Sequence, residues 1–237
     1  MTKAIVKANI RTIYSLIVEQ SPEHHFEFTD PFWVLITTIL SHRTKDEVTD
    51  DAARKLFNKY RNAEGLASAS EKDVLEIIRR VGFSSVKSPR IINAARMILN
   101  EYGGKVPPNL DDLTRIKGVG RKTANVVLAD AFMIPAIAVD THVHRISNRL
   151  GISRSKDPAV IEHELTKIVP RDLWLGFNPR LVEFGKKICR PVGPRCDICK
   201  ISEYCDYYAR IHRNSGSRTI PKCKAKAESG SALAERQ

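Results

Sequence analysis

A glycine-centred bend between two helical patterns constrains this sequence most. Gly118-Val119-Gly120 separates an expected short helix at 109–116 from a longer one at 121–132. Glycine permits a bend that a Cβ would obstruct, so the pattern predicts a helix-hairpin-helix unit. Such a backbone can approach a phosphate closely, and free N–H groups at the start of the second helix point at the anion. The unit therefore predicts contact with a DNA backbone without reading of base sequence.

Two residues, one in the second helix and one after it, have the chemistry of a covalent catalyst. Lys122 lies in its first turn, where the helix dipole disfavours a cation, so the amine should lose its proton easily and act as a nucleophile. Asp140 precedes another expected helix at 141–150, and its carboxylate could take that proton or stabilise a positive charge. Each residue also has an ordinary alternative: a solvated charge for Lys122 and a helix cap for Asp140.

The glycines invite comparison with nucleotide-binding loops. A P-loop has its lysine directly after the last glycine, whereas Arg121 separates Gly120 from Lys122. The third glycine of a dinucleotide fingerprint is absent, and no strand pattern precedes the bend. The bend is therefore not assigned to nucleotide binding.

The overall charge favours a polyanionic partner. The chain of 237 residues has a net charge of +12 and a pI of about 9.6, which is typical of nucleic-acid binders. Its longest apolar run in a helical pattern, residues 32–40, is too short to span a membrane. The N-terminus lacks the apolar core of a signal peptide. We therefore expect a cytoplasmic protein that binds no membrane.

Four cysteines near the C-terminus predict a metal centre. Cys189, Cys196, Cys199 and Cys205 follow the spacing C-x6-C-x2-C-x5-C. In a reducing compartment such a group indicates metal binding and not disulfides. Zinc usually takes paired C-x-x-C units, and four thiolates also suit a [4Fe-4S] cluster, so the spacing leaves both metals open. Cys223 remains as an expected free thiol.

The segments I-K-G-V-G-R-K-T-A-N-V-V and A-V-D-T-H-V-H-R resemble the endonuclease III family of DNA glycosylases, in the helix-hairpin-helix-Gly/Pro-Asp superfamily. The resemblance implies that Lys122 attacks the sugar, that Asp140 assists and that His142 lines the site. It also favours the [4Fe-4S] cluster over zinc. One departure is Lys117, where the family commonly has proline.

The resemblance extends to the expected DNA contacts. The loop Ser41-His42-Arg43-Thr44-Lys45-Asp46 matches the family's damage-pocket loop, and Arg43 stands where the family often has the glutamine that fills the space of the flipped base. An ordinary phosphate contact is the alternative for Arg43. Phe83 matches an apolar wedge that enters the opposite strand. The predicted DNA-binding residues are Ser41, Arg43, Asp46, Phe83, Lys117, Gly118, Val119, Gly120, His142, Lys186 and Arg190.

The fold expected is all-α with two lobes. The resemblance places a six-helix barrel with the hairpin at 27–135, and a cluster domain at 1–26 plus 136–212. Residues 213–237 read as a flexible basic tail. Locally we expect one helix at 3–20, a capping box of Thr44 with Glu47, and a helix at 71–81 closed by Gly82. A further helix should begin at Ser88-Pro89.

The resemblance implies a bifunctional DNA glycosylase and apurinic/apyrimidinic lyase, acting as a monomer on damaged double-stranded DNA. Oxidised pyrimidines of the thymine glycol type are the expected substrates. One alternative is a mismatch glycosylase on the same fold, for thymine or uracil opposite guanine and less so for adenine opposite guanine. Such relatives generally lack the lysine after the hairpin. The other alternative is a non-catalytic helix-hairpin-helix module.

Overall fold

A computed structural model describes residues 3–21 and 28–214, and these residues contain helices and no strand. The predicted all-α class is confirmed. The helices are α1 Lys3–Ala8, α2 Ile10–Glu19, α3 Pro31–Ser41, α4 Asp46–Tyr60, α5 Ala63–Ala67, α6 Glu71–Ile77, α7 Ser84–Tyr102, α8 Leu110–Arg115, α9 Arg121–Phe132, α10 Thr141–Leu150, α11 Pro158–Thr166, α12 Phe177–Lys187 and α13 Asp206–Asn214, with 3-10 turns at Arg171–Leu173 and Ser202–Tyr204. Most of the predicted basic tail, and Cys223, lie outside the described residues.

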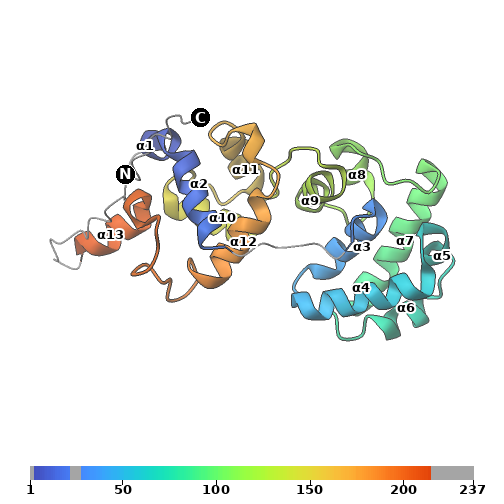
Figure 1. Ribbon diagram of the computed structural model, residues 1–237. Coiled ribbons are helices and arrows are strands. Elements are labelled where there is room, and N and C mark those ends of the chain that lie inside the picture. Colours follow the sequence, from blue (N-terminus) through green and yellow to red (C-terminus); the bar gives the residue numbers. More distant parts are fainter. Residues whose placement is uncertain (1–2, 22–27, 215–237) are drawn as a thin grey trace, which may run out of the picture.

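Two hydrophobic cores divide the helices into two groups, which stand side by side in Figure 1. The first core draws its buried side chains from residues 32–128, in α3 to α9. The second combines α1 and α2 with the chain from Ile137 onward. The N-terminal helices therefore pack with the C-terminal third of the chain. The segment 133–140 links α9 to the second group.

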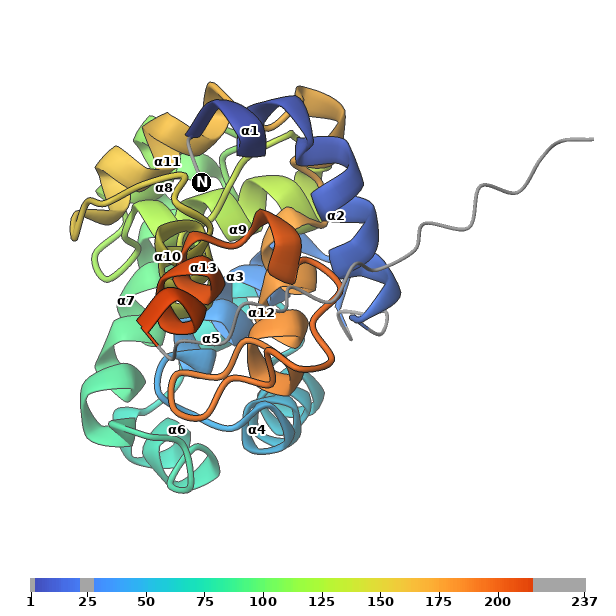
Figure 2. The same ribbon diagram turned by 90° about the vertical axis from the view of Figure 1, so that its left-hand side faces the viewer.

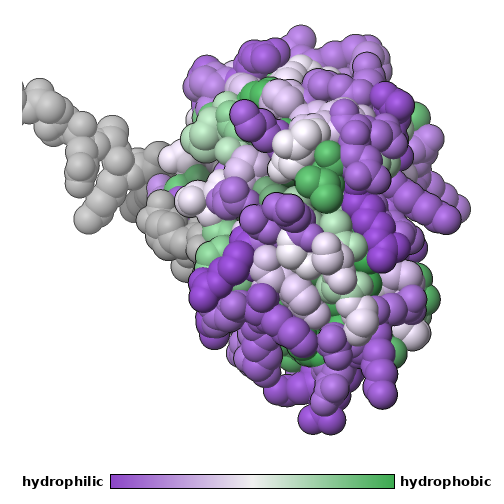
Figure 3. Space-filling view, turned by 90° about the vertical axis from the view of Figure 1, so that its right-hand side faces the viewer, coloured by the Kyte–Doolittle hydropathy of each residue, from purple (hydrophilic) through white to green (hydrophobic). Residues whose placement is uncertain are grey.

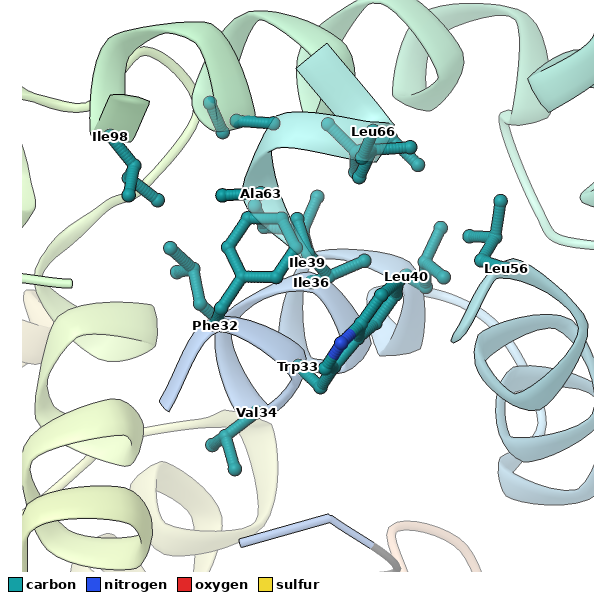
Figure 4. Close-up of a cluster of buried hydrophobic side chains, with 14 of the residues drawn as sticks. Phe32, Trp33, Val34, Ile36, Ile39, Leu40, Leu56, Ala63, Leu66 and Ile98 are labelled. Atoms are coloured by element: carbon teal, nitrogen blue, oxygen red, sulfur yellow. The ribbon is translucent and has the colours of Figure 1, made fainter. Parts of the chain in front are cut away.

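Helix α3 forms the centre of the first core. Every residue from Phe32 to Leu40 is buried, because nearly all of them are apolar and neighbours surround the helix. Figure 4 shows its side chains among those of α4, α5 and α7. Asp30 caps the helix by accepting from the N–H groups of Phe32 and Trp33, and Pro31 takes the first position.

The outer surface agrees with helices that bury one apolar stripe. On the side that Figure 3 shows, hydrophilic side chains dominate and hydrophobic ones appear in small groups between them. No helix in the described ranges is long and apolar enough to cross a membrane.

The single helix expected at 3–20 is wrong, because Asn9 divides it into α1 and α2. Asn9 has φ −111° and ψ 14°, and its side-chain amide donates to the carbonyl of Ile5 at 2.8 Å. An asparagine that bonds the backbone locally competes with helix propagation.

The capping box of Thr44 with Glu47 is also wrong. Lys45 precedes α4, and its side chain makes no cap hydrogen bond. The Thr44 hydroxyl instead accepts from the backbone N–H of Gly82 at 3.2 Å and from Lys87 Nζ at 3.1 Å. Tertiary partners have replaced the local cap that the sequence suggests.

Two further boundaries differ from prediction. Helix α6 ends at Ile77, and Gly82 is not its left-handed terminal residue, because Gly82 has no positive φ. Glycine is needed at this position because a Cβ would lie 2.4 Å from the carbonyl oxygen of Arg43. Helix α7 begins at Ser84, before Pro89, since the carbonyl of Phe83 accepts from the N–H groups of Val86 and Lys87 and closes an earlier turn.

Candidate active site and cysteine cavity

The hairpin joins α8 to α9 by a bend that requires glycine. Gly118 has φ +94°, and a Cβ on it would lie 2.2 Å from Cδ of Arg90. Gly120 precedes the first turn of α9 and is exposed, as is Lys117, whereas the Val119 side chain is buried. The DNA contact that the resemblance implies for Val119 therefore involves no exposed side chain. Asn109 caps α8, and its side-chain oxygen accepts from the N–H of Asp112 at 2.9 Å.

Lys122 is half-buried in the first turn of α9. Burial lowers the pKa of its amine, while the charges of Asp140 and Asp130 act in the opposite direction. From the sequence, the helix dipole was the expected cause of an easily lost proton, whereas in the structure burial lowers the pKa of the amine. The amine therefore faces two carboxylates and is nevertheless shifted towards its neutral form.

Hydrogen bonds from residues of both helix groups hold Asp140 and the segment before it in place. Its Oδ1 accepts from the N–H groups of His142 at 2.9 Å and Val143 at 2.8 Å, so it caps α10. The preceding segment is fixed by two amides. Asn125 on α9 donates to the carbonyl of Ile137 at 3.0 Å, and Asn178 on α12 donates to that of Ala138 at 2.9 Å. The helix cap, which was the ordinary alternative role for Asp140, is therefore present. The same cap holds the carboxylate at the position from which its charge acts on Lys122.

Asp130 is a second carboxylate near Lys122, and no sequence motif points to it. It lies on the same face of α9 as Lys122, because residues 122, 126 and 130 are spaced by four. Burial raises the pKa of Asp130 to about 7, with the Lys122 charge opposing the shift. In the sequence, Asp130 is one polar residue in a helical pattern, and no neighbouring residue distinguishes it from a carboxylate on the protein surface.

The two residues predicted to enter the DNA stack lie against each other. The Arg43 guanidinium lies 5.5 Å from the centre of the Phe83 ring, and Phe83 is 58% exposed. Both are non-glycine residues in the left-handed region, with φ 53° for Arg43 and 58° for Phe83. Such strain concentrates at functional sites. Ser41, at the end of α3, donates instead to the carbonyl of Thr38 at 2.9 Å.

Other predicted DNA contacts have protein partners. Lys186 Nζ lies 2.6 Å from Asp46 and 2.8 Å from Glu183. The ring of His142 lies 3.2 Å from Nη2 of Arg145. Arg190 is exposed, and its carbonyl accepts from Arg149 at 2.7 Å.

The four cysteines line one cavity beside α10 and α12, in the loop that Figure 2 shows between α12 and α13. All four are free thiols. Burial raises the pKa of Cys199 to about 12 and of Cys205 to about 11. Thiolates here would therefore need the positive charge of a bound metal. Arg149 Nη1 also lies 3.3 Å from Sγ of Cys189, a donor suited to a thiolate.

The donor set fits a cluster of several irons. Among the described residues, no three His, Cys, Asp or Glu side chains converge closely enough to hold one metal ion. Four cysteines around one largely apolar cavity are the donor set that an iron–sulfur cluster takes.

Known proteins match this chain over most of its length. Residues 36–171, more than half of the chain, match the family model for HhH-GPD superfamily base excision DNA repair proteins. An endonuclease III from Thermotoga maritima is 47% identical over 194 residues, which cover 82% of this chain and 91% of that protein. The chain belongs to the endonuclease III family of the HhH-GPD superfamily. It is therefore a base excision DNA repair protein.

Solved structures of this family agree with the fold. A trapped endonuclease III–DNA covalent intermediate with an estranged adenine superposes with a TM-score of 0.81 at 33% identity, covering 90% of this chain and all (100%) of that one. A thermostable thymine-DNA glycosylase superposes with a TM-score of 0.78 at 29% identity, covering 86% of this chain and 99% of that one. The family resemblance read from the hairpin and the Asp140 segment is confirmed.

Proposed function

We propose that this chain, a base excision DNA glycosylase with apurinic/apyrimidinic lyase activity, uses Lys122 as its nucleophile and Asp140 as the assisting carboxylate. The observation that carries the proposal is an amine shifted by burial towards its neutral form beside that carboxylate. The trapped covalent intermediate of a relative supports the same chemistry. A non-catalytic module would need neither residue.

The chemistry starts with extrusion of the damaged nucleotide, because its C1′ is out of reach inside the duplex. Lys122 Nζ bonds to C1′, and the base departs with the electron pair of the glycosidic bond and gains a proton. The nitrogen loses its own proton, the sugar ring opens, and a Schiff base results. Loss of a 2′ proton then expels the 3′ phosphate by β-elimination. Asp140 stabilises the positive charge that develops on the sugar and nitrogen.

Borohydride trapping tests the assignment. Lys122→Gln should abolish the trapped protein–DNA adduct, whereas the matched variant Lys117→Gln, which removes an exposed lysine from the same hairpin, should retain it. Asp140→Asn keeps a side chain that caps a helix, so it should fold and yet react far more slowly. An adduct of normal yield in Lys122→Gln would remove Lys122 from its role.

The substrates are expected to be oxidised pyrimidines such as thymine glycol in double-stranded DNA. Similarity to a thymine-DNA glycosylase makes thymine opposite guanine the second candidate. Excision assays on duplexes with each lesion and each opposite base distinguish the two. Release of thymine from the mismatch, with thymine glycol left intact, would favour the second candidate.

We also propose that Cys189, Cys196, Cys199 and Cys205 hold a [4Fe-4S] cluster, which would stabilise the loop that contains them. Purified protein should contain about four iron atoms and four acid-labile sulfides per chain. Zinc in their place would refute the cluster. The cytoplasmic location and the monomeric state belong to the same proposal, and the unpaired thiols are consistent with a reducing compartment.

The two cores support the proposed division into a barrel domain at 27–135 and a cluster domain at 1–26 plus 136–212. The hairpin and Lys122 belong to the first, and Asp140 begins the second. The reactive pair then lies where the two domains meet.

A further inference from the structure

His42 lies beside the reactive lysine and was not among the residues that the sequence singled out. It follows α3, and its ring Nε2 lies 3.3 Å from Oγ1 of Thr123, the residue after Lys122 in α9. Thr123 is 1% exposed and His42 is half-buried, so the contact is largely screened from solvent. The imidazole therefore connects the end of α3 to the first turn of the helix that carries the nucleophile.

The backbone of His42 is fixed independently of this contact. Its carbonyl oxygen accepts from Lys87 Nζ at 2.5 Å and from the hydroxyl of Thr44 at 3.3 Å. Lys87 on α7 is 3% exposed and also donates to the carbonyl of Leu40 at 2.7 Å. These bonds hold the loop in spite of the left-handed conformation at Arg43. The ring is thus placed by anchors that lie outside α9.

The surroundings keep the imidazole uncharged. Cations face it from two elements, Lys122 from α9 and Lys87 and Arg90 from α7. Burial first, and then these charges, lower the pKa of His42 to about 4. At neutral pH the loop therefore presents a neutral ring to Lys122. A neutral ring near the amine brings no charge of its own, so it neither repels the proton of Lys122 nor holds that proton in place.

We propose that His42 is a positioning residue for Lys122: its neutral ring, bonded to Thr123, fixes the first turn of α9 and shields the amine from water. The inference rests on the proposed role of Lys122 as nucleophile. The charges that face the amine are Asp130 on α9 and Asp140 before α10, and both favour its protonated form. Shielding from water is the influence that acts against them. A histidine that only joined α3 to α9 would affect stability and leave the amine's titration unchanged.

The pH dependence of strand cleavage separates these two roles. Single-turnover cleavage of a duplex with a preformed abasic site should be followed across pH, since this substrate bypasses base excision. His42→Ala admits water, so the acid limb of the rate profile should move to higher pH. Each unit of pKa lowers the neutral fraction about tenfold on the acid side, while the rate at alkaline pH recovers. Thr123→Val, which removes the same hydrogen bond from the other side, should move the limb in the same direction.

Rescue and stability complete the test. Glutamine can place a polar atom near the position of Nε2, so His42→Gln should return the acid limb towards that of the unchanged protein. Melting temperatures of all variants are measured in parallel. An acid limb that stays in place in His42→Ala, together with a lower melting temperature, would overturn the inference and leave only a structural role. Loss of the proposed function is recognised separately, by a normal borohydride adduct in Lys122→Gln.

Discussion

The ammonium of Lys186 on α12 lies 2.6 Å from a carboxylate oxygen of Asp46 at the start of α4. This ion pair connects the two cores. A bidentate salt bridge between Arg121 on α9 and Glu162 on α11, with hydrogen bonds of 2.8 and 2.9 Å, also connects them. Asp46 and Lys186 are both predicted from the sequence to contact DNA, and the structure pairs them with each other. A phosphate that binds Lys186 must compete with Asp46.

Variants of this pair should change DNA affinity in opposite directions. Asp46→Asn removes one of the two carboxylates that hold Lys186 and should tighten binding to undamaged duplex at low salt, whereas Lys186→Met should weaken it and reduce the salt slope by about 1. Folding stability should change by less than about 1 kcal/mol, because both side chains are partly exposed. Titration of a labelled duplex at several salt concentrations measures both effects. Asp51→Asn, which unpairs Lys55 on α4, is the control, and a weaker Asp46→Asn would contradict the prediction.

Asp130 should make stability depend on pH. Its pKa is about 7 in the folded chain against an ordinary 3.8, so the folded state binds a proton that the unfolded state lacks between these values. The contribution of Asp130 to the free energy of unfolding is therefore present at acid pH and is lost as pH rises through about 7. Asp130→Asn should raise the melting temperature above neutral pH and leave it unchanged near pH 4.

The same change removes a negative charge that faces Lys122, so the acid limb of strand cleavage should move to lower pH. Thermal melts and single-turnover rates across pH measure the two effects. Glu76→Gln, on an exposed position of α6, serves as the control. An equal rise in melting temperature at all pH values would mean that Asp130 is not protonated on folding.

Lys87 should be essential to stability in spite of its charge. It is 3% exposed, and its amine donates to the carbonyls of Leu40 and His42 and to the Thr44 hydroxyl. Lys87→Met leaves these buried acceptors unpaired and should lower the free energy of unfolding by about 2–3 kcal/mol. Urea unfolding measures this loss. Lys72→Met, at an exposed position on α6, should change it by less than about 0.5 kcal/mol, and equal effects of the two variants would refute the assignment.

Phe83 should matter for excision and little for folding. The ring is 58% exposed, so Phe83→Ala should preserve the melting temperature. Unstacking a base step costs a few kcal/mol, and loss of an apolar wedge should slow single-turnover excision from a duplex on the order of tenfold. Val86→Ala, at a side chain that is 50% exposed on α7, is the matched control. Unchanged excision in Phe83→Ala would exclude the wedge.

Sequence patterns predicted the elements whose signals are local. Asp140 stands at the start of α10, and α9 and α10 have the predicted bounds. Caps and glycine bends depend on hydrogen bonds within a few residues, so they can be read from neighbouring letters. The same reasoning failed at Thr44, where more distant partners took the hydroxyl.

The sequence by itself determined an all-helical chain with a glycine hairpin, a lysine after it and four clustered cysteines. Only the tertiary structure decided which groups surround that lysine: Asp130 shifted by burial, Asp140 held by Asn125 and Asn178, and His42 placed by Lys87. Burial and charge at one point depend on side chains from helices far apart in the chain. A linear pattern contains residue types and spacings, and it does not contain these distances.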